Sequence, residues 1–341
     1  MAIVEQTLVA PKIQNRHSAL GLSDDQLLHM YSSMLLSRAL DERTWLLNRQ
    51  GIGHFAVPSG GHEAAAVGYA IALRPGQDWI VPHYRDQAAL LLLGLTPREV
   101  MLAYLGKAAD TSSGARQMFA HWSLERINLT SMGSVQGPQA PRGVGLALAS
   151  KIKGEDAVTW IGFGDGTSSQ GDIHEAMNWA SIHKLPCVFW CENNGIAISV
   201  TQNNQMAIQN VADRAAAYGM PGVIVDGNDP LAVYAATREA IARARSGAGP
   251  TLIEAKCNRL MPHTSNDDDR YRSVDLLSAL KQQDPIPQFK QYLESTSVLN
   301  ERADKELRAW VTAQVDDATD FAMKSPEPDP STVWDHVYAG S

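Results

Sequence analysis

The N-terminal part of the chain places apolar side chains at helical spacing, between residues that favour helix starts and stops. Residues 23–26, SDDQ, predict a capping box that opens a long amphipathic helix, and QGIG at 50–53 predicts its end. Thr96 and Pro97, followed by Glu99, predict a second capped helix. Residues 62–73, HEAAAVGYAIAL, are apolar on nearly all sides, which indicates burial or a subunit interface.

The C-terminal half follows a different pattern, in which short apolar runs alternate with amphipathic segments. The sequence predicts strands at 78–81, 156–163, 185–191, 222–227 and 250–257, and helices at 141–152, 172–184, 208–219 and 230–246. Such alternation is typical of a doubly wound α/β fold, with a mostly parallel sheet and helices on both faces. Between these parts, residues 107–141 are rich in Gly, Ser, Gln and Thr with little periodicity, which predicts a functional or mobile loop.

These elements suggest three regions along the chain. Residues 1–22 form an N-terminal extension, residues 23–272 form the α/β domain, and residues 273–341 form a helical segment that packs on the domain or at a subunit interface. The first residues contain no apolar leader, and no apolar run is long enough to cross a membrane. We therefore expect a soluble, cytoplasmic protein.

Composition narrows the classes of partner. The 341 residues are 44% hydrophobic and 19% charged, and the net charge of -8 argues against nucleic acid or an anionic membrane as a partner. The three cysteines, Cys187, Cys191 and Cys257, form no CxxC motif, which favours a reducing compartment.

Candidate chemistry lies at the ends of two successive predicted strands. Asp165 stands between two glycines, Gly164 and Gly166, after the strand at 156–163, and Asn193 and Asn194 follow the next strand. Neighbouring parallel strands lie about 4.8 Å apart, so both tips can reach one small object. A carboxylate with amide and carbonyl oxygens suits Mg²⁺, and the helix that starts near Asp172 favours an anion at its N-terminus. The sequence therefore predicts a magnesium–diphosphate site.

Three other interpretations remain open at this point. GDG or NNG alone is more often an ordinary turn, because Asp and Asn tolerate positive φ. GFGDG also resembles a dinucleotide loop of an NAD-dependent dehydrogenase, with Glu192 available for a ribose, although the third small residue of that fingerprint is missing. The third interpretation is that the chain is a non-catalytic scaffold that only binds a partner.

The motifs in order resemble a known family. GDGTSSQGDIHEAMNWA followed by NNGIAIS resembles the thiamine diphosphate motif, and GGHEAAAVG, HYRDQAALLLLG, GARQMFAHW, PQAPRGVGLALASK and PTLIEAKCNRLMPHTSNDDDRYRS resemble alpha subunits of branched-chain 2-oxo acid dehydrogenases. The resemblance covers roughly residue 23 to the C-terminus. It implies the diphosphate-binding half of a thiamine diphosphate enzyme and the oxidative decarboxylation of branched-chain 2-oxo acids. PHTSNDDDRYR favours this branch over the alternative, a pyruvate or acetoin dehydrogenase alpha subunit.

The resemblance also implies partners. A separate beta subunit supplies the glutamate that activates the cofactor, in a heterotetramer of two alpha and two beta chains, and the acyl group passes to lipoamide on a transacylase. The apolar helices at 64–73 and 88–95 would supply subunit interface.

Site residues follow from the resemblance position by position. Asp165, Asn194 and the backbone carbonyl of Ile196 correspond to the Mg²⁺ ligands, with Gly164 and Gly166 beside them. Thiamine diphosphate contacts are expected from Tyr84, Arg85, Ser134, Gln136 and His263.

His263 is also the candidate catalytic residue. The resemblance places it in the active-site loop, where it assists proton transfer during acyl transfer, and an unperturbed pKa near 6.5 would suit that role. The acidic run 267–269 is expected to form salt bridges with Arg270 and Arg272. Phe55 is a candidate for the acyl pocket, although a core role is equally compatible with its sequence.

Four positions depart from the family pattern or bear on regulation. Glu192 replaces an arginine that some relatives direct to the diphosphate, Pro138 replaces a threonine that helps hold potassium in animal relatives, and Gln170 replaces a glutamate. We therefore expect no potassium site. Thr264 occupies the loop position at which animal relatives carry a regulatory phosphoserine.

Overall fold

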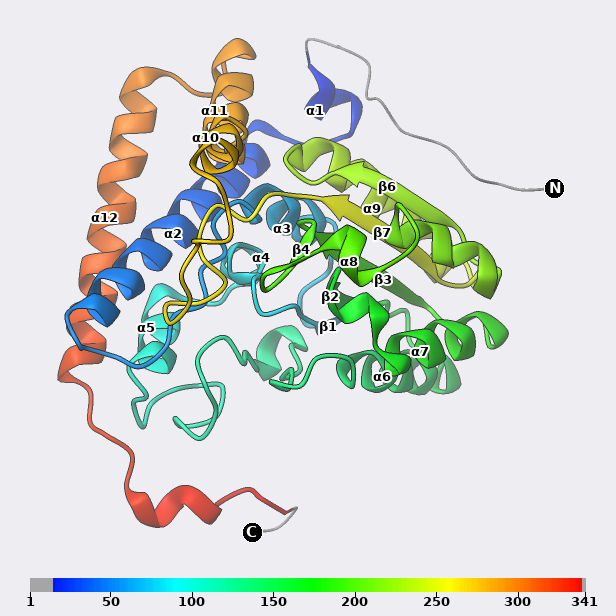
Figure 1. The fold of residues 1–341 in the computed structure, drawn as a ribbon, viewed down its shortest axis with the longest axis horizontal. Coiled ribbons are helices and arrows are strands. Elements are labelled where there is room, and N and C mark those ends of the chain that lie inside the picture. Colours follow the sequence, from blue (N-terminus) through cyan, green and yellow to red (C-terminus); the bar gives the residue numbers. More distant parts are fainter. Residues whose placement is uncertain (1–14, 339–341) are drawn as a thin grey trace.

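The fold is built around a parallel sheet of five strands in the order β1-β2-β3-β7-β6 (Figure 1). The computed structural model describes residues 15–338, so most of the predicted N-terminal extension lies outside the described residues. The strands are β1 (Trp79–Val81), β2 (Thr159–Gly164), β3 (Cys187–Asn193), β6 (Gly222–Asp226) and β7 (Thr251–Lys256). The predicted parallel α/β fold is confirmed.

Helices cover both faces of this sheet. Helices α6 (Gln139–Lys153) and α7 (Gly171–Ile182) and the 3₁₀ helix η3 (Val211–Tyr218) share one apolar cluster with Ile161, Phe163 and Phe189 of the sheet. Helices α3 (Glu63–Ala70) and α9 (Pro230–Arg245) share the other with Trp160 and Trp190. Successive strand residues point to opposite faces, so these buried strands are apolar on both sides.

A helical layer lies against the α3 side of the sheet (Figure 1). Helix α2 (Asp24–Arg49) packs on α4 (Gln87–Leu93) and on α12 (Glu301–Lys324), and α12 also packs on α5 (Pro97–Tyr104). The C-terminal region further contains α10 (Val274–Gln282) and α11 (Pro285–Ser295), the latter against α2 and α3. The division into three regions stays a prediction.

The shorter elements are α1 (Arg16–Ala19), η1 (Glu125–Ile127), η2 (Thr167–Ser169), β4 (Ile196–Ala197), β5 (Val200–Thr201), α8 (Gln202–Gln205) and η4 (Pro330–Trp334).

Both capping boxes form as expected from the sequence. The Ser23 hydroxyl accepts from the Gln26 backbone N–H while the Gln26 side chain accepts from Ser23, and Thr96 and Glu99 do the same at α5. Each box satisfies backbone donors that a helix start would otherwise leave without partners.

One expectation about helices is wrong. The helices at 64–73 and 88–95 were expected at a subunit interface, but every residue of α3 and α4 is buried within this chain, so the apolar surface of these two helices is already covered. The helix expected at 208–219 forms as the 3₁₀ helix η3. There the Ala212 N–H donates to the Glu254 carboxylate of β7 at 2.8 Å, a long-range contact that local sequence does not reveal.

The long loop at 107–141 is folded against the sheet edge. Its residue Leu129 bridges to Ile80 of β1, and Trp122 is buried. The Asp110 carboxylate accepts from the backbone N–H groups of Ser112, Ser113 and Ala115, which fixes a turn. Between residues 15 and 338, no helix combines the length and apolar character needed to span a membrane. The three cysteines are all free and buried.

Candidate functional site

A cavity of about 420 Å³ opens at the carboxyl ends of the central strands. In a parallel sheet, the loops after neighbouring strands meet at this edge. Every site residue predicted from the sequence lines this one cavity: Phe55, Tyr84, Arg85, Ser134, Gln136, Gly164, Asp165, Gly166, Asn194, Ile196 and His263. They come from loops far apart in the chain, so the fold brings them together.

Asp165 lies at the tip of β2, where Gly164 pairs with Glu192 of β3. The residue is only 2% exposed, and its Oδ2 has no hydrogen-bond partner among residues 15–338. Burial raises the pKa of Asp165 above its usual range, and backbone N–H groups of Asp165 and Asn194 partly oppose this shift. A buried carboxylate oxygen without a partner is costly, which makes it suited to a cation.

The two asparagines at the end of β3 have different roles. The Asn193 amide points into the protein, where Nδ2 donates to Glu254 at 2.6 Å and to Gln202 at 2.9 Å. Asn194 instead lines the cavity. Ile196 follows in β4, which pairs with β5 as a short antiparallel hairpin along the cavity wall. The sequence could not separate the two asparagines except through the family resemblance.

These oxygen donors fit a magnesium ion. Among residues 15–338 no three His, Cys, Asp or Glu side chains converge on a metal position. Mg²⁺ does not need such a cluster, since it is often held by one carboxylate plus amide, carbonyl, water and phosphate oxygens. The unpartnered Asp165 oxygen, the Asn194 amide and the Ile196 carbonyl form a set of that kind.

The glycines on either side of Asp165 lie where side chains would crowd the site. A Cβ on Gly166 would stand 2.8 Å from the Ala197 Cβ, and one on Gly164 would stand 3.4 Å from the His83 Nε2. The α8 residue Gln205 holds the same turn, because its Nε2 donates to the Asp165 carbonyl at 2.8 Å. The backbone can therefore pass close to a ligand at this point.

Arg85 reaches the cavity from the loop after β1. Its guanidinium donates from Nη2 to the ring Nδ1 of His263 at 2.8 Å and to the His263 carbonyl at 3.0 Å, and from Nη1 to the Pro58 carbonyl. Its Nε is buried and has no hydrogen-bond partner in the part of the chain that the structure describes. The Tyr84 ring lies 4.9 Å from the guanidinium and meets the His263 ring edge-on. A guanidinium with a donor to spare is suited to a phosphate.

The titration of His263 differs from the expectation. Burial, Arg85 and Arg259 together lower its pKa to about 4, so the imidazole is neutral at pH 7. Arg85 can only donate, so Nδ1 of His263 accepts and the ring proton lies on Nε2. The sequence alone suggested an unperturbed pKa, because neither the burial of His263 nor the approach of the two arginines can be seen before the chain folds.

The loop that carries His263 is held by the salt bridges expected from its acidic run. Arg272 pairs with Asp269 at 2.5 Å and donates to the carbonyls of Arg259 and Met261, while Arg270 pairs with Asp268 at 2.5 Å on the surface. Thr264 is buried, with 8% of the residue exposed, and its hydroxyl donates to the Asp267 carboxylate at 2.6 Å.

The long loop contributes a pair of side chains to the site, of which the sequence predicted only one. Ser134 was expected, but its partner His121 was not: their Oγ and Nε2 are 2.8 Å apart. Gln136 donates to the Gly133 carbonyl at 3.1 Å. Phe55 forms an apolar wall of the cavity together with Val57, Met118, Phe119, Ala120 and Met132.

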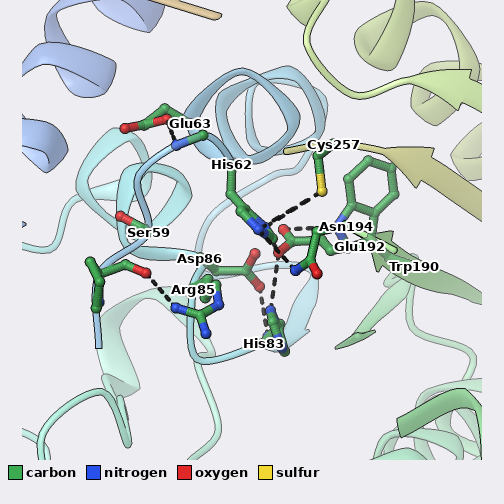
Figure 2. Close-up of polar contacts among 12 residues, drawn as sticks. Ser59, His62, Glu63, His83, Arg85, Asp86, Trp190, Glu192, Asn194 and Cys257 are labelled. Carbon is green, nitrogen blue, oxygen red and sulfur yellow. Dashed lines mark hydrogen bonds and ion pairs between the residues drawn. The ribbon is translucent and has the colours of Figure 1, made fainter. Parts of the chain in front are cut away.

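Beneath the cavity lies a buried polar cluster around Glu192 (Figure 2). One carboxylate oxygen is 2.7 Å from Nδ1 of His62 and 3.0 Å from Nδ1 of His83, and the other accepts from Trp190 Nε1 at 3.3 Å. Although burial raises the pKa of Glu192, the two histidines hold it well below its usual range. Burial and the Glu192 carboxylate raise the pKa of Asp86 well above its usual range.

This cluster settles where Glu192 points. The side chain is fully buried and does not line the cavity, so it is not placed to bind a ribose as the dinucleotide interpretation required. His83 does line the cavity, and its buried Nε2 has no hydrogen-bond partner among the described residues. No pattern in the sequence indicated a role for His62 or His83, apart from their position inside motifs that carried the resemblance.

Comparisons with known proteins show which family the sequence matches. A family model described as "Dehydrogenase E1 component" matches residues 31–331. The chain is 45% identical over 326 residues to the 2-oxoisovalerate dehydrogenase subunit alpha of Bacillus subtilis (strain 168), covering 95% of this chain and 99% of that protein. It is 39% identical over 319 residues to the 3-methyl-2-oxobutanoate dehydrogenase subunit alpha of Mycobacterium tuberculosis (strain ATCC 25618 / H37Rv), covering 93% and 84%. It is 38% identical over 288 residues to the pyruvate dehydrogenase E1 component subunit alpha of Staphylococcus aureus (strain N315), covering 84% and 75%.

Proposed function

Because this chain belongs to the dehydrogenase E1 component family, we propose that it is the alpha subunit of a branched-chain 2-oxo acid dehydrogenase. With a beta subunit, it would catalyse the oxidative decarboxylation of branched-chain 2-oxo acids and the reductive acylation of lipoamide on a transacylase. The observation that carries the proposal is the gathering of all the predicted site residues around one cavity, with the unpartnered Asp165 oxygen at its base.

Two observations favour a branched-chain substrate over pyruvate. The relatives named for 2-oxoisovalerate and 3-methyl-2-oxobutanoate match more of this chain than the one named for pyruvate, at 95% and 93% against 84%. The apolar wall around Phe55 also suits a branched acyl group, which gains more from burial than a methyl group does. Pyruvate or acetoin remains the alternative substrate class.

Thiamine diphosphate and Mg²⁺ are the proposed cofactors. Asp165, Asn194 and the Ile196 carbonyl would hold the metal, and Arg85 with Tyr84 would bind the diphosphate. When bound, thiamine diphosphate supplies the electron sink that the loss of carbon dioxide from a 2-oxo acid requires. Ser134 and Gln136 would contact the organic rings of the cofactor.

The environment of His263 bears on the role that we propose for it. As a neutral imidazole with Nδ1 occupied by Arg85, it carries its proton on Nε2, where it can donate a hydrogen bond to a ligand in the cavity. From the resemblance we assign it the proton transfer that accompanies acyl transfer to lipoamide, a role that requires Arg85 to release Nδ1 so that the ring can take up a proton there. A cytoplasmic location also stays part of the proposal, and the three free cysteines are compatible with it.

The test uses the full chain purified together with its beta subunit. Thiamine diphosphate, Mg²⁺ and NAD are titrated separately, and decarboxylation of 3-methyl-2-oxobutanoate and of pyruvate is then measured. We expect Mg²⁺-dependent thiamine diphosphate binding and preferential turnover of the branched acid. NAD binding without thiamine diphosphate would instead favour the dehydrogenase of the other class, and no ligand at all would favour a scaffold.

Asp165→Ala tests the metal assignment. It should abolish Mg²⁺-dependent cofactor binding and leave the fold intact, because no described side chain donates to this buried carboxylate and its Oδ2 is without a partner, so the change leaves no side-chain donor unsatisfied. Circular dichroism and thermal melting check the fold. Full activity of this variant would contradict the assignment of Asp165 as a ligand.

His263→Ala tests the transfer role. Decarboxylation measured with an artificial electron acceptor should suffer less than acyl transfer to lipoamide, since only the second reaction uses the proposed proton transfer. An equal loss in both assays would argue against this role.

A further inference from the structure

Asn194 is attached to a chain of buried hydrogen bonds that begins at Glu192 (Figure 2). Nδ1 of His62 lies 2.7 Å from the Glu192 Oε2, and Nε2 of the same ring lies 3.3 Å from the Asn194 Nδ2. His62 and Glu192 are both fully buried, and Cys257 Sγ packs 3.7 Å from the ring. His62 therefore connects a fixed carboxylate to a side chain on the cavity wall.

The direction of each hydrogen bond follows from the groups involved. A carboxylate accepts only, so Nδ1 of His62 carries the proton and donates it to Glu192. In the neutral ring the opposite nitrogen, Nε2, has a lone pair and accepts from the Asn194 amide nitrogen, which can only donate. Both hydrogen bonds are satisfied by a single tautomer of the ring.

This chain of donors fixes which way the Asn194 amide faces. With Nδ2 donating to His62, Oδ1 lies on the other side, where it accepts from the Ile196 backbone N–H at 3.3 Å and keeps a second lone pair. A flipped amide would set Oδ1 against the lone pair of His62 and Nδ2 against the N–H of Ile196, so two attractive contacts would become repulsive. An asparagine amide alone has no such preference.

We propose that His62, oriented by Glu192, is a positioning residue that holds the Asn194 amide oxygen toward the cavity as a ligand for a divalent cation. The inference rests on the proposed metal site. Histidine and carboxylate groups that orient a ligand from behind typically change metal affinity by about 10–100-fold when they are lost. Glu192 thus serves the site without entering the cavity.

The binding test replaces His62 in two ways. Mn²⁺ affinity is measured by electron paramagnetic resonance in the presence of thiamine diphosphate, on the chain purified with its beta subunit. We expect His62→Leu to weaken Mn²⁺ binding by about 10–100-fold. His62→Gln should stay close to wild type, because the glutamine amide can donate to Glu192 and accept from Asn194. His17→Leu is the matched control, since His17 is also buried but pairs with Tyr292 far from the cavity.

The outcomes separate this inference from the proposed function. If the wild-type protein binds no Mn²⁺, the proposed metal site fails. If it binds Mn²⁺ and His62→Leu binds equally tightly, the positioning role is wrong. The role is also wrong if His62→Gln loses as much Mn²⁺ affinity as His62→Leu does.

A second measurement needs no variant and so does not depend on whether a variant folds. Neutron diffraction from deuterium-exchanged crystals of the wild-type protein should show deuterium on Nδ1 of His62, none on Nε2, and an Asn194 amide nitrogen facing His62. Deuterium on Nε2 would overturn the proposal.

Discussion

Gly166→Ala adds one methyl group beside the proposed metal site and leaves every polar side chain in place. Gly166 has helical backbone angles, φ -58° and ψ -45°, which alanine adopts without strain. The effect must therefore come from contact alone. The added Cβ would stand 2.8 Å from the Ala197 Cβ, whereas ordinary contacts begin at 3.4 Å, so the two segments must separate by roughly 0.6 Å.

The displaced segment includes a proposed ligand. Ala197 follows Ile196 in β4, so a shift of the hairpin moves the Ile196 carbonyl with it. Mg²⁺ requires oxygen atoms at about 2.0–2.1 Å in near-octahedral geometry, and a site displaced by more than about 0.5 Å is poorly formed. We expect Mn²⁺ affinity to fall by about 10-fold or more, and stability to fall by about 1–3 kcal/mol from overpacking.

Titration calorimetry with Mn²⁺ and thiamine diphosphate measures the first effect, and chemical denaturation measures the second. Gly171→Ala is the matched control, because an added Cβ there meets nothing within 4 Å. The control should bind Mn²⁺ as wild type does. Wild-type affinity in Gly166→Ala, with the control also unchanged, would refute the placement of the Ile196 carbonyl in the metal site.

Further predictions concern the loop that carries His263. Arg85→Met should raise the pKa of His263 above about 4 but not fully to 6.5, because burial is the larger cause of the shift; histidine-selective NMR titration measures this. In the wild type, the unfolded chain takes up a proton at His263 that the folded chain does not, so this group should reduce stability as pH falls from about 6.5 to about 4. If the wild type and His263→Gln lost the same stability between about pH 6.5 and about pH 4, the lowered pKa of His263 would be contradicted. Arg272→Ala should cost about 1–3 kcal/mol in denaturant melts because it leaves Asp269 and two loop carbonyls without a donor. Arg270→Ala should change nothing measurable, since its pair with Asp268 is exposed, and equal effects of the two variants would refute the distinction.

Local patterns in the sequence were sufficient for the elements and for the edge of the sheet that carries the site. The capping residues Ser23 and Thr96 mark helix starts through contacts with residues three positions later, which sequence spacing reveals directly. Asp165 and Asn194 end successive strands, and parallel pairing brings strand ends together whatever the side chains are. The roles of the remaining site residues came from the resemblance to a family rather than from such spacing.

What the sequence could not reveal depends on contacts between distant segments. The cluster of His62, His83 and Glu192 joins residues more than one hundred positions apart, and no periodicity connects them. The low pKa of His263 likewise depends on burial by the fold and on Arg85, which lies 178 positions earlier. The interface expected at α3 failed for the same reason, since an apolar helix looks alike in sequence whether its own chain or a partner covers it.

The hydrogen bonds of Arg85 carry a consequence for how tightly the site can hold an anion. A guanidinium has five N–H donors, and Arg85 uses three of them: one on Nη1 for the Pro58 carbonyl and two on Nη2 for the His263 carbonyl and ring. A phosphate that binds through the remaining donors, on Nε and Nη1, leaves the loop anchored. A phosphate that binds through Nη2 must displace His263, so only that mode of anion binding releases the loop.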